Sequence, residues 1–203
     1  MTEMDPAALG AALRTLHLER EAELRAQWHR SLPLPELLTD RWERAARLGF
    51  GEGASIYDSA LVLGEVEVGA HTWIGPNTLL DGSGGLLRIG AWCSVSAGVH
   101  LYTHDTVRRS LSMGAAPRAA GPVSVGDGCH LGAQSVIVLG VSIGARCVVG
   151  ANSFVNADVP DRAIVVGSPA RVVGRVVGDG DDIALEVGPE AAGSLLAGDP
   201  EIP

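Results

Sequence analysis

The chain has 203 residues, a formal net charge of −9, three cysteines and 46% apolar residues, which suits a folded domain with short appendages. This acidity argues against nucleic acid or an anionic membrane as a partner, and no run of about 18 residues is apolar enough to cross a bilayer. The sparse cysteines without CxxC spacing, and the lack of a secretory signal, lead us to expect a cytoplasmic protein.

Residues 1–50 are predicted to form an N-terminal helical segment. The pair Asp5-Pro6 suits the start of a helix, and leucines then recur at helical spacing as far as Trp28. Pro33 interrupts this pattern, and a shorter helix is expected over residues 36–47.

Residues 51–178 carry an internal repeat with a period of six residues, which slips once at a three-residue insertion within residues 81–85. This period fits neither a helix nor a single alternating strand, whereas short strands and turns stacked as a parallel β-solenoid would bury one aliphatic anchor per unit. Fourteen anchors at three per coil predict between four and five coils. The anchors are Ile56, Val62, Val68, Ile74, Leu80, Ile89, Val95, Leu101, Val125, Leu131, Ile137, Ile143, Val149 and Val155.

Two other positions of the repeat favour particular residue types. Glycine often follows the anchor, as at Gly69 and Gly132, and we expect it to supply a positive φ at the corner. Cys93, Cys129 and Cys147 all stand two residues before an anchor. This shared register predicts that the three thiols are buried by packing.

Two segments depart from the repeat. Residues 102–122 form a polar, irregular excursion, and a rigid wall that carries such a loop is a typical place for a functional site. Residues 179–203 contain seven acidic residues and no basic residue. We expect these last residues to form an acidic C-terminal tail whose removal leaves cofactor binding intact.

The repeat, the Tyr102-Thr103-His104 segment and the closing run from Gly167 to Val173 resemble the hexapeptide-repeat acyltransferases. The resemblance covers roughly residues 56–175 and is nearest to the maltose and galactoside O-acetyltransferases and related sugar acyltransferases. It implies a mainly β fold, a left-handed parallel β-helix with an N-terminal helical segment. It also implies a homotrimer with active sites between subunits, acetyl-CoA as cosubstrate and no metal.

The resemblance assigns the catalytic role to His104, which matches the general base of the family. An acceptor hydroxyl must lose its proton as it attacks a thioester carbonyl, and a neutral imidazole can take up that proton. Asp105 is a candidate to orient the ring. Asn77 and Asp81 lie near the positions that contact the sugar acceptor in the family.

The same resemblance implies a binding site for coenzyme A. Arg171 and Arg175 match positions near the nucleotide end, where guanidinium groups suit phosphate. The chain departs from the family at His130, where an aromatic residue is common, and at Ala157, where lysine is frequent. The positions that match contacts to the pantetheine arm are Ala133, Ala151 and Asn156.

We therefore predict an acyl-CoA-dependent O-acyltransferase that acts on a hydroxyl of a sugar or similar small molecule. An N-acyltransferase acting on an amino sugar remains an alternative, because the same base serves both reactions. A zinc enzyme like the γ-class carbonic anhydrases is another, since imidazoles can bind zinc, although His100 and His104 are spaced by four residues instead of the five of that class. A non-catalytic β-helix binding module is the third alternative.

Overall fold

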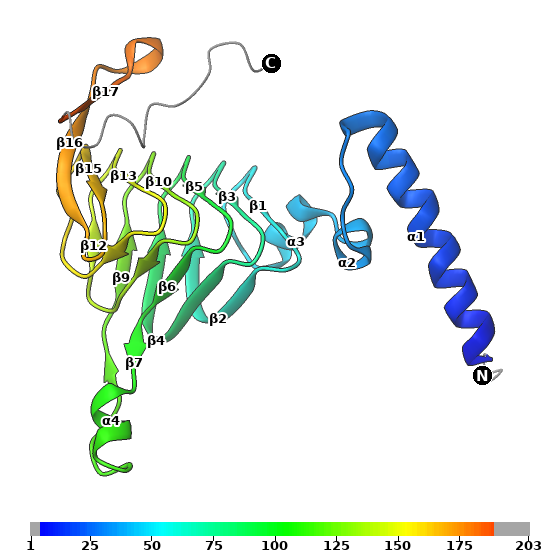
Figure 1. Ribbon diagram of the computed structural model, residues 1–203, viewed down its shortest axis with the longest axis horizontal. Helices are drawn as coiled ribbons and strands as arrows, with labels where there is room; N and C mark the ends of the chain where they lie inside the picture. The colour runs from blue at the N-terminus through cyan, green and yellow to red at the C-terminus, as the bar shows by residue number, and fades with distance from the viewer. Residues whose placement is uncertain (1–4, 189–203) are drawn as a thin grey trace. The chain divides into compact units, whose positions relative to one another are not determined.

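The computed structural model describes residues 5–188, which form two compact units that divide between Asp40 and Arg41 (Figure 1). Each unit is described by itself. The short helix α3 (Arg41–Arg47) groups with the repeat, although sequence analysis assigned it to the N-terminal segment. The predicted domain boundaries themselves stay predictions.

The first unit consists of α1 (Pro6–Trp28) and α2 (Leu34–Leu38). The carboxylate of Asp5 accepts a hydrogen bond from the Ala7 backbone N–H and caps α1, as the Asp-Pro pair predicts. The single helix predicted over residues 36–47 is wrong, because Thr39 adopts an extended conformation that ends α2 before α3 begins. No helix within residues 5–188 is long and apolar enough to cross a membrane.

The second unit is a parallel β-helix whose coils have three faces (Figure 1). One sheet forms the first face, and strands of a second sheet form the other two, with β2 and β4 each extending over both. The first sheet contains, in order, β1 (Ser55–Ile56), β3 (Trp73–Ile74), β5 (Ser94–Val95), β10 (His130–Leu131), β13 (Val148–Val149), β15 (Ala163–Val166), β16 (Arg171–Val177) and β17 (Ala184–Val187). The second contains β12 (Ser142–Ile143), β9 (Val123–Val125), β4 (Leu79–Ile89), β6 (His100–Tyr102), β11 (Val136–Ile137) and β14 (Phe154–Val155), with β2 (Leu61–Val68) beside β4.

The aliphatic anchors fill the interior of this β-helix. Successive coils pair in register, so that Leu131 lies between Val95 and Val149. Every predicted anchor is buried except Val62, which is half-buried. Cys93, Cys129 and Cys147 are also buried, and each thiol donates to a backbone carbonyl of the next coil, at 3.2, 3.0 and 3.1 Å. The predictions of a solenoid and of buried thiols are confirmed.

The predicted reason for the glycines after the anchors is wrong. The left-handed backbone conformation occurs instead at positions three residues before anchors. Non-glycine residues adopt it there, such as His71, Trp92 and Arg146, with φ between 56° and 57°. At Gly132, by contrast, an added Cβ would lie 2.5 Å from the backbone N of Ala151 in the next coil. Glycine is required there because successive coils approach closely, not because φ is positive.

Both ends of the β-helix are covered. Near its first coil, Ala45 of α3 and Phe50 join the buried core. At the other end, β16 pairs antiparallel with β15, and β17 pairs with β16 after a 3₁₀ turn at Gly180–Asp182. Residues 179–188 of the predicted tail therefore continue the folded structure, whereas 189–203 lie outside the described residues.

The irregular segment 102–122 projects from the β-helix as predicted. It contains β7 (His104–Asp105), the short helix α4 (Val107–Leu111) and β8 (Ala119–Ala120), and β7 pairs antiparallel with β8 (Figure 1). The base of this projection brings His104 to the edge of the second sheet.

Candidate functional site

Strand register places His104 beside a carboxylate from the preceding coil. β6 runs parallel to β4 with Tyr102 opposite Asp81. The backbone N–H of Thr103 then donates to the carbonyl of Asp81 at 3.1 Å, which continues the pairing beyond β6. His104 follows directly and lies over the segment after Asp81.

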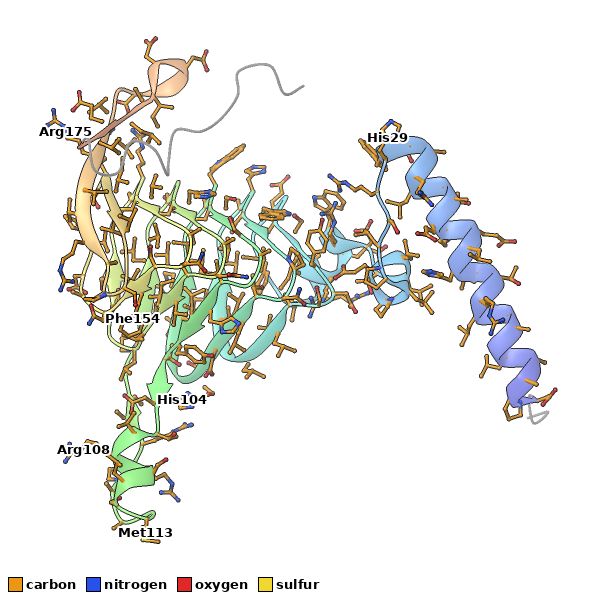
Figure 2. All side chains as sticks on the ribbon, viewed as in Figure 1. His29, His104, Arg108, Met113, Phe154 and Arg175 are labelled. Atoms are coloured by element: carbon orange, nitrogen blue, oxygen red, sulfur yellow. The ribbon has the colours of Figure 1, made fainter. Side chains whose placement is uncertain are left out.

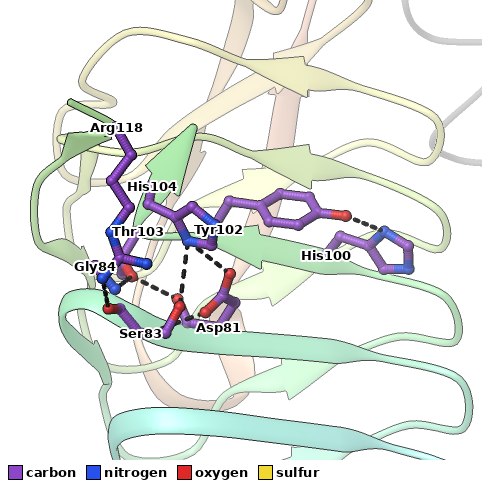
Figure 3. Close-up of polar contacts among 8 residues, drawn as sticks. All are labelled: Asp81, Ser83, Gly84, His100, Tyr102, Thr103, His104 and Arg118. Carbon is purple, nitrogen blue, oxygen red and sulfur yellow. Dashed lines mark hydrogen bonds and ion pairs between the residues drawn. The ribbon is translucent and has the colours of Figure 1, made fainter. Parts of the chain in front are cut away.

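Asp81 and His104 form a close polar pair (Figure 3). Oδ2 of Asp81 lies 3.0 Å from Nδ1 of His104, and its carboxylate side chain is only 3% exposed. The other oxygen, Oδ1, accepts the backbone N–H of Ser83 at 2.9 Å. If Nδ1 carries the proton donated to this carboxylate, Nε2 holds the free lone pair and can act as a base.

Several residues that are not among the predicted site residues hold this pair. Ser83 Oγ lies 3.2 Å from His104 Nδ1, and Arg118 Nη2 donates to the Ser83 carbonyl at 2.7 Å (Figure 3). Thr103 is fully buried, and its hydroxyl donates to the Asp81 carbonyl at 2.7 Å. An added Cβ on Gly84 would lie 2.6 Å from that of His104, so glycine is needed for the close approach. The sequence signal for this arrangement was the insertion within residues 81–85.

An open cavity of about 590 Å³ adjoins His104. Val107 borders it on the side of the projecting segment, and Tyr102, Val136 and Phe154 line it from the second sheet, with Val138 just after β11. The lining is therefore mostly apolar, with His104 as its basic group and Asp105 as its acidic group. Such a cavity can hold the reacting groups of a small substrate away from bulk water.

The residues predicted to bind coenzyme A fall into three places. Ala133 and Ala151 are stacked at the corner before β11 and β14, where the Ala133 carbonyl accepts the Asn152 N–H at 2.9 Å. Asn156 and Arg171 line a second cavity of about 200 Å³ at the last coil. Arg175 stands apart from both and forms an ion pair with Glu186 of β17, at 2.7 Å.

The predicted acceptor contacts are likewise separated. Asn77 is exposed at a corner, with φ of 56°, whereas Asp81 is buried against His104. The carboxylate of Asp105 accepts the backbone N–H of Val107 at 3.0 Å, and the ion pair of His104 within residues 5–188 is with Asp81 instead. The acidic partner of His104 is therefore Asp81, the residue that we expected to contact the sugar.

The other histidines occupy different parts of the β-helix. His71 stacks on Trp92, with ring centroids 4.2 Å apart, and Nδ1 of His100 lies 3.2 Å from the Tyr102 hydroxyl. Desolvation lowers the pKa of His130. Residues 5–188 contain no group of three His, Cys, Asp or Glu side chains that could hold a metal ion.

The match to a known family model lies within the six-residue repeat. Residues 122–157 match the family model described as the hexapeptide repeat of succinyl-transferase. The carnitine operon protein CaiE of Escherichia coli O7:K1 is 35% identical over 132 residues, which are 62% of this chain and 67% of that protein. The protein of the same name from Salmonella agona is 37% identical, and this chain spans 65% of its length.

Two further relatives carry more specific names. A dTDP-3-amino-3,6-dideoxy-α-D-galactopyranose 3-N-acetyltransferase from Aneurinibacillus thermoaerophilus is 47% identical over 60 residues, 30% of this chain and 31% of that protein. A hexapeptide-repeat acetyltransferase from Vibrio cholerae, solved with acetyl-CoA, has 28% identity and a TM-score of 0.56 over 87% of this chain and 94% of its own. The predicted fold class, a mainly β, left-handed parallel β-helix with an N-terminal helical segment, is confirmed.

Proposed function

Because the chain belongs to the hexapeptide-repeat acyltransferase family, we propose that it transfers an acyl group from an acyl-CoA, with acetyl-CoA as the cosubstrate, to a hydroxyl of a sugar or similar small molecule. The observation that carries this proposal is the pair formed by His104 and the buried carboxylate of Asp81, beside an open cavity. The proposed general base is Nε2 of His104.

The reaction requires one proton to move twice. Nε2 of His104 takes the proton of the acceptor hydroxyl as the oxygen attacks the thioester carbonyl carbon, and a tetrahedral intermediate forms. Its collapse breaks the carbon–sulfur bond, and the imidazolium returns the proton to the leaving thiolate of coenzyme A. Asp81 has a positioning role, because a carboxylate at Nδ1 fixes the ring orientation and stabilises the imidazolium.

The cavity at the last coil, with Arg171 and Asn156, and the corner with Ala133 and Ala151 have the chemistry to bind coenzyme A. Arg171 is exposed, and within residues 5–188 its guanidinium makes one hydrogen bond, to the neighbouring Ala170 carbonyl at 2.8 Å. Its other N–H groups have the chemistry to bind phosphate. Asn156 shares its cavity. Ala133 and Ala151 present small side chains and backbone at a corner, which suits close contact with a pantetheine arm.

An amino sugar is the alternative acceptor. The relative from Aneurinibacillus thermoaerophilus is named for N-acetylation of such a sugar. An acceptor amine also loses a proton during acyl transfer, so the same His104–Asp81 pair would serve. A screen with paired hydroxyl and amine acceptors separates the two chemistries.

We propose that the active protein is a homotrimer. The outward side of the face formed by β2, β4, β6, β11 and β14 exposes apolar side chains, among which Leu61, Leu63 and Phe154 are 59%, 47% and 36% exposed. Leu61 and Phe154 stand at the two ends of one cross-strand row, with Leu79, His100 and Val136 between them. A second copy covering this face would remove these apolar side chains from water and would border the cavity beside His104.

The proposed reaction is tested by following CoA release from acetyl-CoA with a panel of sugars and amino sugars. We expect His104→Ala to lower kcat by about 10²- to 10⁴-fold, whereas His71→Ala, at a different corner of the β-helix, keeps the wild-type rate. Circular dichroism verifies that both variants are folded. Unchanged turnover in His104→Ala would refute the role of His104, and absence of CoA release with every acceptor would favour the non-catalytic binding module.

A further inference from the structure

The projecting segment 102–122 has a charge opposite to that of the whole chain. It contains Arg108, Arg109 and Arg118, and Asp105 is its single acidic residue, in a chain whose formal net charge is −9. All three arginines are exposed. Figure 2 shows Arg108 on this projection, away from the body of the β-helix.

These arginines lack the carboxylate partners that other arginines of the β-helix have. Arg88 pairs with Glu67 at 2.8 Å, and Arg162 pairs with Asp179 at 2.7 Å. None of the ion pairs within residues 5–188 includes an arginine of the segment 102–122. Three arginines and one aspartate therefore give the segment a formal charge of +2.

Arg118 is held beside the proposed general base. Its Nη2 donates to the carbonyl of Ser83 at 2.7 Å, and the hydroxyl of the same Ser83 lies 3.2 Å from Nδ1 of His104 (Figure 3). The pairing of β7 with β8, with His104 opposite Ala120, holds the two chain segments together. A guanidinium has five N–H donors, and this contact uses one of them.

We infer that the acceptor carries an anionic group, a phosphate or a carboxylate, near the atom that is acylated, and that Arg118 binds this group. The inference rests on the proposed function and specifies its acceptor. A guanidinium can bind either anion with two parallel hydrogen bonds, which would orient the acceptor toward Nε2 of His104. The exposed Arg108 and Arg109 would add a local positive field that attracts such an acceptor to an otherwise acidic protein.

The first experiment measures CoA release with sugars presented in three matched forms: neutral, phosphorylated and oxidised to the carboxylate, each as a hydroxyl and as an amino sugar. We expect kcat/KM to be at least about 100-fold higher for an anionic form than for its neutral counterpart. The phosphate and carboxylate arms identify which anion is used. Equal or better turnover of the neutral forms would overturn the inference while leaving the proposed function intact, and no CoA release in any arm would contradict both.

The second experiment compares three variants with the acceptor found in this way. Arg118→Met should raise KM for the anionic acceptor by about 10- to 100-fold, with KM for acetyl-CoA unchanged, and Arg118→Lys should retain part of the affinity. Arg88→Met, which removes an exposed arginine from another face, is the matched control and should have no effect. A rise in KM for acetyl-CoA in Arg118→Met would assign the arginine to the cofactor, and an equal loss with neutral and anionic acceptors would assign it to holding Ser83; either result overturns the inference.

Discussion

His104 obtains its acidic partner from the preceding coil of the β-helix. Asp105 follows it in the chain but directs its carboxylate to the Val107 N–H, whereas Asp81 reaches Nδ1 at 3.0 Å. Adjacent residues of an extended segment point to opposite sides, and the nearest side chains come from the neighbouring strand. The family resemblance therefore pointed to His104 as the proposed base, and stacking of the coils decided its acidic partner.

Asp81→Asn tests this pair at the scale of one residue. The amide can present an N–H to Nδ1 and so favour the tautomer in which Nε2 is protonated, which cannot act as a base. We expect kcat to fall by about 10²- to 10⁴-fold with little change in KM for acetyl-CoA, as measured by CoA release. Asp105→Asn is the control, because an asparagine oxygen can still accept the Val107 N–H. A larger loss of kcat in Asp105→Asn than in Asp81→Asn would contradict the assignment.

The coils impose two different demands on the residues at their corners. The position three residues before most anchors takes a left-handed backbone conformation, as at His71, Trp92 and Arg146. The position after the anchor lies against the backbone of the next coil, so that a side chain on Gly132 has no room. The sequence shows where glycine recurs, but the reason depends on the distance between coils.

Substitutions at two glycines of the same coil separate the effect of close approach between coils from the effect of a positive φ. Gly132→Ala places a Cβ 2.5 Å from the backbone N of Ala151, and we expect it to lower the free energy of unfolding by about 1–3 kcal/mol. Gly128→Asn should cost less than about 1 kcal/mol, because asparagine tolerates a positive φ and an added Cβ at Gly128 would meet only the flexible Arg146 side chain, at 3.4 Å. Chemical denaturation measures both, and a larger loss in Gly128→Asn would contradict the close-approach explanation.

At the scale of the whole molecule, two faces of the β-helix differ in polarity. The face that carries Leu61, Leu63 and Phe154 exposes apolar side chains, whereas the face formed by β9, β12 and the second halves of β2 and β4 exposes Glu67, Arg88 and serines. Exposed apolar patches of this kind mark association surfaces. The apolar face is therefore where we expect copies of the chain to meet.

The proposed trimer predicts a mass of three times the 20.9 kDa chain in analytical ultracentrifugation. Introducing Leu61→Glu together with Leu63→Glu should shift the protein to monomer and lower kcat, because burying unpaired carboxylates in an interface is costly. Ser124→Glu adds a carboxylate beside Arg88 on the polar face and should leave the trimer intact. A wild-type monomer with full activity would refute the proposal.

Acidic residues near the C-terminus form ion pairs with arginines of the β-helix. Asp179 forms ion pairs with Arg146 and Arg162, and Glu186 pairs with Arg175. Removing residues 179–203 deletes seven acidic residues and no basic residue, which changes the formal net charge from −9 to −2. We expect this truncation to leave acetyl-CoA affinity intact by calorimetry and to lower the thermal midpoint, because β17 no longer pairs with β16. A large loss of affinity would show that these residues belong to the binding site.

The sequence by itself determined the solenoid, the register of its anchors and the projecting segment, because each depends on a local period or on its interruption. The proposal of His104 as the base came from the family resemblance. Only the tertiary structure decided that Asp81 and Ser83 lie against His104, with Arg118 bonded to the Ser83 carbonyl, and that the predicted coenzyme A contacts occupy three separate places. Contacts between coils depend on how many residues each coil contains, and the insertion within residues 81–85 and the projection at 102–122 alter that number. The six-residue period does not predict how these changes shift one coil against the next. The residues that surround His104 therefore had to be taken from the packed structure.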